Sequence, residues 1–228
     1  MHNWPSLPAG HIGVNPGPMM AAADRIEIVV HGKGGHGAHP YLAIDPVLVA
    51  GHIITAMQSI VARNVSPVDS AVISICVGAY SVIPREARLI GTVRTFRPEV
   101  QDMVEERLAR LVDSVAVAFG ATASLHYQRT YPATINSGLH AMFAADVAAS
   151  LVGEERVTRQ MSPSMGAEDF SFMLQVKPGA YLRLGQGGGA FLHNSRYDFN
   201  DDVLPLGGAL LAGLVERSLP LAASETLL

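Results

Sequence analysis

The segment HGKGGHGAHP, residues 31–40, concentrates three histidines and four glycines in ten residues. Neutral imidazoles are good zinc ligands, so His31, His36 and His39 could together form a metal site. No carboxylate or thiol accompanies them, however, and the loop would have to fold back on itself. Glycines ahead of a helix could also hold a phosphate, but both the GxxxxGK[ST] order and the GxGxxG placement are absent.

Two further interpretations of this segment are open. It can be a tight turn whose histidines are merely solvated. Alternatively, one histidine on a rigid, glycine-flanked loop can donate an N–H to a reaction centre on another domain or subunit. The residues alone do not decide among the four.

Histidine stands beside asparagine in two other polar segments, HNWP at His2 and LHNSRYDFND at residues 192–201. His2 and His193 are therefore candidate metal ligands, although a lone histidine is usually structural. Glu168, in the EDF segment, stands at an expected helix start, where a carboxylate caps the helix. DFNDD lacks the glycine and distal glutamate of a calcium loop, and GQGGG at residues 185–189 is interpreted as a flexible loop.

Composition limits the partners and the compartment. The chain has 228 residues, 49% of them apolar, and a formal charge of −4 without a basic patch, so nucleic acid is not expected as a partner. No apolar run reaches membrane-spanning length and no export signal is visible. Cys76 is the single cysteine and lies in an apolar strand pattern, where we expect it to be buried. We expect a cytoplasmic protein.

Hydrophobic periodicity predicts the order β-α-β-β-α-β over residues 24–131. The expected elements are strands at 25–31, 68–77, 87–95 and 121–127, with helices at 46–63, after an Asp45 N-cap, and 99–119. The first helix is expected to bury Val47, Ala50, Ile54, Met57 and Val61. The second is expected to bury Val100, Val104, Leu108, Leu111, Val115 and Phe119.

The predicted fold is mixed α/β (α+β). The β-α-β-β-α-β order is that of a ferredoxin-like domain, in which two helices cover one face of a four-stranded sheet. We expect this domain, residues 24–131, to be inserted into a second, discontinuous domain made of residues 1–23 and 132–228. Helices at 137–151, 168–174 and 204–219 and a strand at 180–184 are expected in that second domain.

Six segments in order resemble the metal-dependent amidohydrolase family of hippurate hydrolase, N-acyl-amino-acid deacylases and plant auxin-conjugate hydrolases. They are HNWPSLPAG, GKGGHGAHPYLAIDP, YSVIPREARLIGTVRTF, MGAEDFSF, PGAYLRLGQG and LHNSRYDFNDDVLPLGG. The resemblance implies a zinc-peptidase-like catalytic domain with two divalent ions (Zn, Mn, Co or Ni) and an inserted domain through which a homodimer forms. The implied substrate is an N-acyl amino acid or a similar small conjugate.

The resemblance also implies roles for individual residues. His2 and His193 match metal ligands, and His36 matches the histidine that reaches the partner subunit's active site and stabilises the oxyanion. His39 falls at a variable position of the same motif. Arg94, in GTVRT, matches an arginine that holds the substrate carboxylate.

Two further positions carry less definite implications. Ser81 stands where the family has an asparagine that contacts substrate, and the shorter serine keeps a hydrogen-bond donor. Glu168 matches a glutamate near the metal site whose role the resemblance does not specify.

Two family segments are missing from this sequence: the HACGHD-type metal-binding segment and the Glu-Glu pair that supplies a general base and a ligand. The family's hydrolysis needs both, so we expect this chain to be a C-terminal portion, inactive alone, that binds metal weakly or not at all. Met1 is then an internal methionine taken as a start. A second hypothesis is a non-enzymatic dimerisation or small-molecule-binding module.

Overall fold

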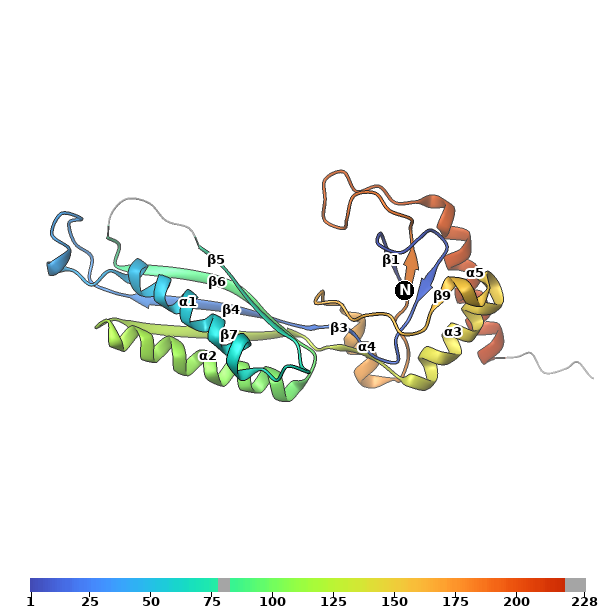
Figure 1. Cartoon of the computed structure of the whole chain (residues 1–228), viewed down its shortest axis with the longest axis horizontal. Coiled ribbons are helices and arrows are strands. Elements are labelled where there is room, and N and C mark those ends of the chain that lie inside the picture. Colours follow the sequence, from blue (N-terminus) through green and yellow to red (C-terminus); the bar gives the residue numbers. More distant parts are fainter. Residues whose placement is uncertain (78–82, 220–228) are drawn as a thin grey trace, which may run out of the picture. The chain divides into compact units, whose positions relative to one another are not determined.

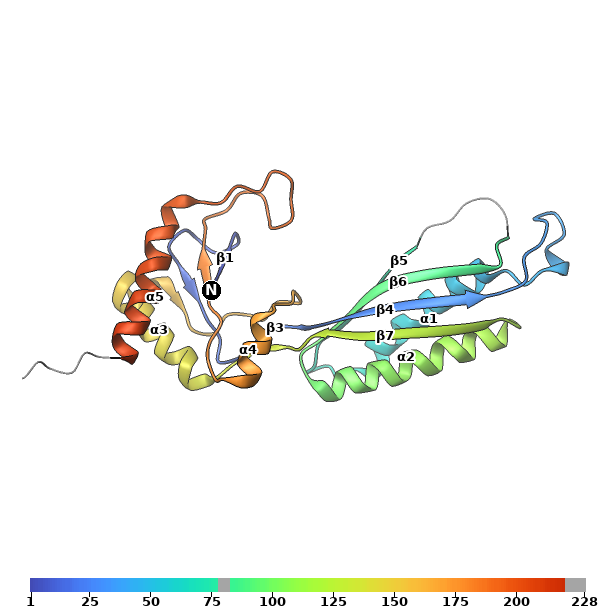
Figure 2. The ribbon, with the colours of Figure 1, turned by 180° about the vertical axis from the view of Figure 1, so that it is seen from behind.

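The computed structural model describes residues 1–77 and 83–219. The chain divides into two compact units of mixed α/β structure (Figures 1 and 2). Unit 1 comprises Met1–Met19, Thr134–Pro163 and Phe170–Leu228, and unit 2 comprises Met20–Ala133 and Ser164–Asp169. Each is described separately below.

Unit 2 is a four-stranded antiparallel sheet with two helices on one face (Figure 1). The strand order across the sheet is β5-β6-β4-β7. In chain order the elements are β4 (Ala22–His31), α1 (Pro46–Asn64), β5 (Ala71–Val77), β6 (Glu86–Thr95), α2 (Pro98–Ala118) and β7 (Thr122–Tyr131). A short 3-10 helix, Pro40–Leu42, lies between β4 and α1.

The start of α1 follows from the sequence. Asp45 is its N-cap, and the carboxylate accepts hydrogen bonds from the backbone N–H groups of Val47 and Leu48. These bonds satisfy two of the amides that the first helical turn leaves without partners, and Pro46 fits at the first position because it needs none. The predicted cap is confirmed.

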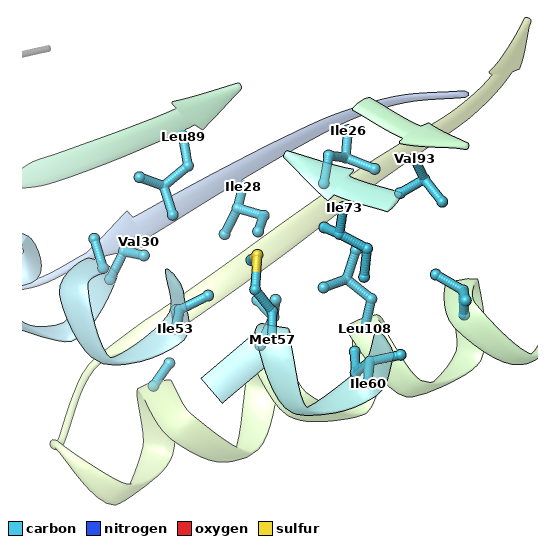
Figure 3. Packing of buried hydrophobic residues seen from close by; sticks show 14 of the residues in the cluster. Ile26, Ile28, Val30, Ile53, Met57, Ile60, Ile73, Leu89, Val93 and Leu108 are labelled. Carbon is cyan, nitrogen blue, oxygen red and sulfur yellow. The ribbon is translucent and has the colours of Figure 1, made fainter. Parts of the chain in front are cut away.

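The core of unit 2 lies between the sheet and the helices (Figure 3). From the sheet it takes Ile26, Ile28, Val30, Ile73, Leu89 and Val93, and from the helices Val49, Ile53, Met57, Ile60, Val104 and Leu108, among others. Among the described residues, helix α1 is the one helix that is long and apolar enough to cross a membrane, by length and composition only. In this structure Val49, Ala50, Ile53, Met57 and Ile60 of α1 are buried in the core of unit 2.

The predicted helix stripes were partly wrong. Val47 is 45% exposed and Phe119 is 40% exposed, whereas Val49, Ile53 and Ile60 are buried. Helix α1 is apolar around most of its circumference, so several stripes satisfy the 3.6-residue period. Packing against the sheet selects one of them.

The face of the sheet without helices mixes polar side chains with apolar ones, such as Ile90, which is 58% exposed. Side chains alternate along a strand, so Ile73 points into the core and Cys76 lies on the other face, where it is exposed. The expectation that Cys76 is buried was wrong. The residues around Cys76 in the sequence are apolar, which is typical of a strand that is buried on both faces. Strand β5 is covered by helices on one face only.

A buried carboxylate links the sheet to α2. Asp24, 1% exposed, accepts from Gln101 Nε2 at 2.9 and 2.8 Å and from the Tyr127 hydroxyl at 2.6 Å. Burial and the adjacent carboxylate raise the pKa of Tyr127, so the hydroxyl remains a donor. This network holds the beginning of β4 against α2.

Unit 1 contains a sheet of short strands in the order β1-β10-β2-β9, with β1 parallel to β10. Its strands are β1 (His2–Trp4), β2 (Ile12–Gly13), β9 (Val157–Thr158) and β10 (Arg183–Gly185), and a separate pair joins β3 (Gly17–Met20) to β8 (Thr134–Asn136). The helices are α3 (Gly138–Val152), α4 (Phe170–Val176) and α5 (Leu204–Ser218), with 3-10 turns at Glu154–Arg156 and Asp201–Val203.

Small residues allow close packing in unit 1. Ala141, Ala144, Ala145 and Ala148 are buried along α3, and they form a core with Ile12, Val14, Leu184 and Leu210. The observed strand β10 is shorter than expected, and α4 begins at Phe170 rather than at Glu168.

Leu108→Ala tests the core of unit 2. Leu108 is fully buried on α2, so its truncation should lower the unfolding free energy by about 2–5 kcal/mol through lost burial and a residual cavity. Hydrogen exchange of β4 and β6 amides measures this locally. Leu48→Ala is the control, because Leu48 is 54% exposed on α1. Equal effects of the two changes would contradict the assigned packing.

Candidate active site

His2 lies on β1, directly opposite Arg183 of β10 in the parallel ladder. Its Nδ1 is 2.6 Å from the backbone oxygen of Asn3. A carbonyl oxygen can only accept, so Nδ1 carries the proton and the neutral ring keeps a lone pair on Nε2. A metal-binding histidine has this tautomer and this kind of contact. His2 therefore fits a metal-ligand role.

His193 lies in the loop between β10 and α5 and is exposed. Its φ of 64° makes it the one non-glycine residue of the described chain in the left-handed region. That conformation is unfavourable for a side chain with a Cβ, and the surrounding structure must hold it. Backbone strain of this kind is frequent at functional sites.

Gln186 joins the segment of His2 to the loop of His193. It is 3% exposed, and its Oε1 accepts from Asn3 Nδ2 at 2.9 Å and from the Tyr197 hydroxyl at 2.8 Å. Asn3 Nδ2 also donates to the Tyr197 oxygen. The Gln186 Nε2 donates to the Asp198 carbonyl at 2.9 Å. One buried carboxamide thus connects three segments.

The glycines after Gln186 are fixed as well. The N–H groups of Gly187 and Gly188 donate to the carbonyls of Leu7 and Pro5, both at 3.0 Å. The expectation of a flexible GQGGG loop was therefore wrong at its beginning, because the HNWPSLPAG segment supplies acceptors for its backbone.

A cation–π contact supports the same region. The Arg183 guanidinium carbon is 3.9 Å from the centre of the Trp4 ring, and the Phe191 ring meets Trp4 edge-on at 6.1 Å. Arg183 is 1% exposed and donates to the carbonyls of Met19 and Ser162. Burial lowers the pKa of its guanidinium. Trp4 of HNWP is thus held between two other segments of unit 1.

In unit 2, the loop that carries His36 is closed at its base. Lys33 and Ile44 exchange two backbone hydrogen bonds of 2.9 Å. A Cβ on Gly32 would lie 2.2 Å from the Ile44 carbonyl oxygen, and one on Gly35 would lie 2.8 Å from the Ala43 side chain. Only glycine permits these approaches, so the glycines give the loop its shape.

His36 is exposed at the tip of this loop. The N–H of Ala38 donates to its Nδ1 at 3.1 Å. An imidazole that accepts at Nδ1 carries its proton on Nε2, so the neutral ring presents Nε2–H as a donor. The His36 and His39 rings are 5.5 Å apart, whereas His31 is at the end of β4, 3.9 Å from Glu86. The structure therefore separates His31 from the other two histidines of the motif, whose rings are in contact.

Arg94 lies half-buried on the helix-free face of the sheet. Its Nε donates to Thr92 Oγ1 at 3.1 Å, and Thr92 in turn donates to the Asp24 carbonyl at 2.8 Å. The guanidinium is thereby oriented, with its Nη groups left for a ligand. Ser81, the other expected substrate contact, lies outside the described residues.

Glu168 is half-buried in the Ser164–Asp169 segment, which packs with unit 2 through the pairing of Ser164 with Met20. Within residues 1–77 and 83–219, no group of three His, Cys, Asp or Glu side chains is placed to hold a metal ion. A metal at His2 or His193 would need further ligands.

The sequence did not single out Asn3, Gln186, Tyr197 or Arg183. The one signal for Gln186 in the sequence was its position among glycines, directly after an expected strand. Its partners are up to 183 positions away in sequence, so its role could not be inferred without the fold.

Comparison with known proteins gives a consistent result. The model of peptidase family M20/M25/M40 matches residues 1–217. The chain is 38% identical over 218 residues to the N-acetylcysteine deacetylase of Bacillus subtilis and 35% identical over 223 residues to the hippurate hydrolase of Campylobacter jejuni. These matches cover 94% and 95% of this chain.

A crystal structure from Bacillus subtilis, described as a dinuclear metal binding peptidase from the M20 family, superposes with a TM-score of 0.75 at 32% identity. The superposition covers 96% of this chain and 56% of the chain in that crystal structure. The two relatives are covered over 57% and 58% of their length. The chain therefore spans little more than half the length of these proteins.

Gln186→Leu tests the network that joins the His2 and His193 segments. The change removes the acceptor that the half-buried Asn3 amide and Tyr197 hydroxyl share, so unit 1 should lose about 1–3 kcal/mol of stability. Amides of residues 193–200 should exchange faster. Exposed Gln160→Leu is the control, and hydrogen exchange measures both. An exchange profile shared by the two variants would contradict the role of Gln186.

Proposed function

Because the chain belongs to peptidase family M20/M25/M40, we propose that it carries part of the machinery of a metal-dependent amide hydrolase acting on N-acyl amino acids or similar small conjugates. The observation that carries this proposal is the family match over residues 1–217. The names of two relatives, N-acetylcysteine deacetylase and hippurate hydrolase, support the substrate class.

His2 and His193 are the proposed metal ligands. The His2 tautomer supports its part, since Nε2 is left with a lone pair. Two divalent ions (Zn, Mn, Co or Ni) would, when bound, polarise the amide carbonyl and supply a nucleophile. Two histidines hold such an ion weakly without carboxylate or thiolate ligands, so we expect weak metal binding by this chain.

His36 is the proposed oxyanion stabiliser. Its Nε2–H is free to donate from the tip of a loop that is fixed at its base, which is the geometry required of a preorganised donor. Amide hydrolysis places negative charge on the former carbonyl oxygen, and a donor in place before the reaction stabilises that charge. The proposal includes donation to the active site of the partner subunit.

Arg94 is the proposed contact for the substrate carboxylate. N-acyl amino acids carry one carboxylate next to the scissile amide, and a guanidinium can bind it through two parallel hydrogen bonds. Thr92 accepts from Nε, and the two Nη groups have no acceptor among the described residues and can bind a carboxylate. Ser81 is proposed as a further contact, and Glu168 as a residue near the site.

Unit 2 is proposed to be a ferredoxin-like dimerisation domain, inserted into a partial catalytic domain that corresponds to unit 1. Its element order and the sheet order β5-β6-β4-β7 support the ferredoxin-like assignment. The proposed domain bounds are 24–131, flanked by 1–23 and 132–228. Among the described residues β5 and β7 are the edge strands of this sheet, and an edge strand can pair with another chain, which supports a homodimer. A cytoplasmic location stays a prediction.

Zinc titration tests the ligand assignment. We expect His2→Ala and His193→Ala each to weaken zinc binding at least about tenfold, measured by competition with a chromogenic chelator. His140→Ala is the control, because His140 is half-buried in the same unit and its Nδ1 lies 2.9 Å from Ser137 Oγ. Zinc binding that none of the changes affects would contradict the assignment and favour the non-enzymatic module.

An activity assay tests the proposed incompleteness of the machinery. We expect no turnover of hippurate or N-acetyl amino acids by this chain with Zn²⁺, Mn²⁺ or Co²⁺, because no carboxylate completes the metal site among the described residues. The His36→Ala variant should be indistinguishable from the unmodified chain. Turnover that disappears in His36→Ala would show that the chain is active.

A further inference from the structure

A second arginine lies beside Arg94 on the helix-free face of unit 2. In the β4–β6 ladder, Arg25 is directly opposite Thr92, and Ala23 is opposite Arg94. Arg25 and Arg94 are therefore diagonal neighbours on one face, with Cβ atoms roughly 7–8 Å apart, within reach of long side chains.

The hydrogen bond to Thr92 brings the Arg94 guanidinium toward Arg25. Arg94 Nε donates to Thr92 Oγ1 at 3.1 Å, so its side chain runs back along β6 to the residue opposite Arg25. Thr92 is itself fixed by its bond to the Asp24 carbonyl. The guanidinium of Arg94 is thus held next to Thr92, the residue directly opposite Arg25.

Neither guanidinium has a carboxylate partner among the described residues. Across the sheet, Arg25 is flanked by the neutral side chains of Gln128 and Thr92, with Ser74 beyond. Glu27, two positions along β4 on the same face, is paired with Arg88 at 2.7 Å. Arg25 near the beginning of β4 and Arg94 near the end of β6 therefore carry two positive charges that no carboxylate among the described residues neutralises.

Two such charges repel each other, and an anion that contacts both removes this repulsion. A single carboxylate is already accommodated by the two Nη groups of Arg94. A second acidic group on the same molecule would contact Arg25, which is exposed. The pair therefore favours a ligand with two carboxylates a few ångströms apart.

We propose that Arg25 is a specificity-determining residue, and that Arg25 and Arg94 together select N-acyl derivatives of acidic amino acids, such as N-acylglutamate or N-acylaspartate. Arg94 holds the carboxylate next to the amide, and Arg25 holds the side-chain carboxylate. This inference rests on the proposed function, and it adds the chemical class of the amino acid. Both arginines belong to unit 2, so the chain as it exists can be tested for binding without a metal.

The experiment is an NMR titration of the ¹⁵N-labelled chain, following the arginine Nε–H signals. The ligands are N-acetylglutamate, N-acetylaspartate and the monocarboxylate hippurate, at low ionic strength. We expect both dicarboxylates to bind about five- to tenfold more tightly than hippurate, with the signals of Arg25 and Arg94 shifting. Added salt should reduce this preference.

Three variants separate the contributions. Arg25→Gln should abolish the preference for dicarboxylates and leave hippurate binding unchanged, whereas Arg94→Gln should weaken binding of all three ligands. Arg107→Gln is the control, since it removes the same charge from an exposed position on α2, on the helix side of the sheet, and should change nothing.

The outcomes distinguish this inference from the proposed function. If hippurate binding depends on Arg94 but Arg25→Gln behaves like Arg107→Gln, the role of Arg25 is wrong and the proposed function stands. If Arg94→Gln leaves hippurate binding unchanged, the proposed carboxylate contact is wrong. A chain that binds none of the ligands contradicts both.

Discussion

The register of β4 against its two neighbours is the constraint on which unit 2 depends. β4 is ten residues long and pairs with β6 on one side and β7 on the other. Because side chains alternate, this register places Ile26, Ile28 and Val30 in the core and Arg25 on the opposite face. A slip of one residue would exchange the two faces, so the core and the arginine pair are fixed by the same pairing.

Unit 1 depends on polar contacts as much as unit 2 depends on the register of β4. Its sheet strands are two or three residues long, and a ladder of that length constrains little by itself. The Gln186 carboxamide and the Trp4–Arg183 contact join segments from both ends of the sequence. Buried polar groups of this kind stabilise only when all their partners are present, which makes the arrangement specific.

In His2 and His36, a single contact between Nδ1 and the backbone decides whether Nε2 is an acceptor or a donor. His2 Nδ1 faces a carbonyl oxygen, so its Nε2 is an acceptor suited to a metal ion. His36 Nδ1 faces an amide N–H, so its Nε2 is a donor suited to an oxyanion. Residue type alone is the same in both cases, and the local fold decides the role.

The sequence by itself determined the family, the order of the elements in unit 2 and the Asp45 cap, because these depend on local patterns and ordered motifs. It also selected His2, His36, His193 and Arg94, whose roles remain predictions. Only the tertiary structure decided which stripe of α1 is buried, that Cys76 is exposed, and that Gln186, Thr92 and Arg25 lie beside the candidate residues. These features depend on strand register and on partners far apart in sequence, which local periodicity does not specify.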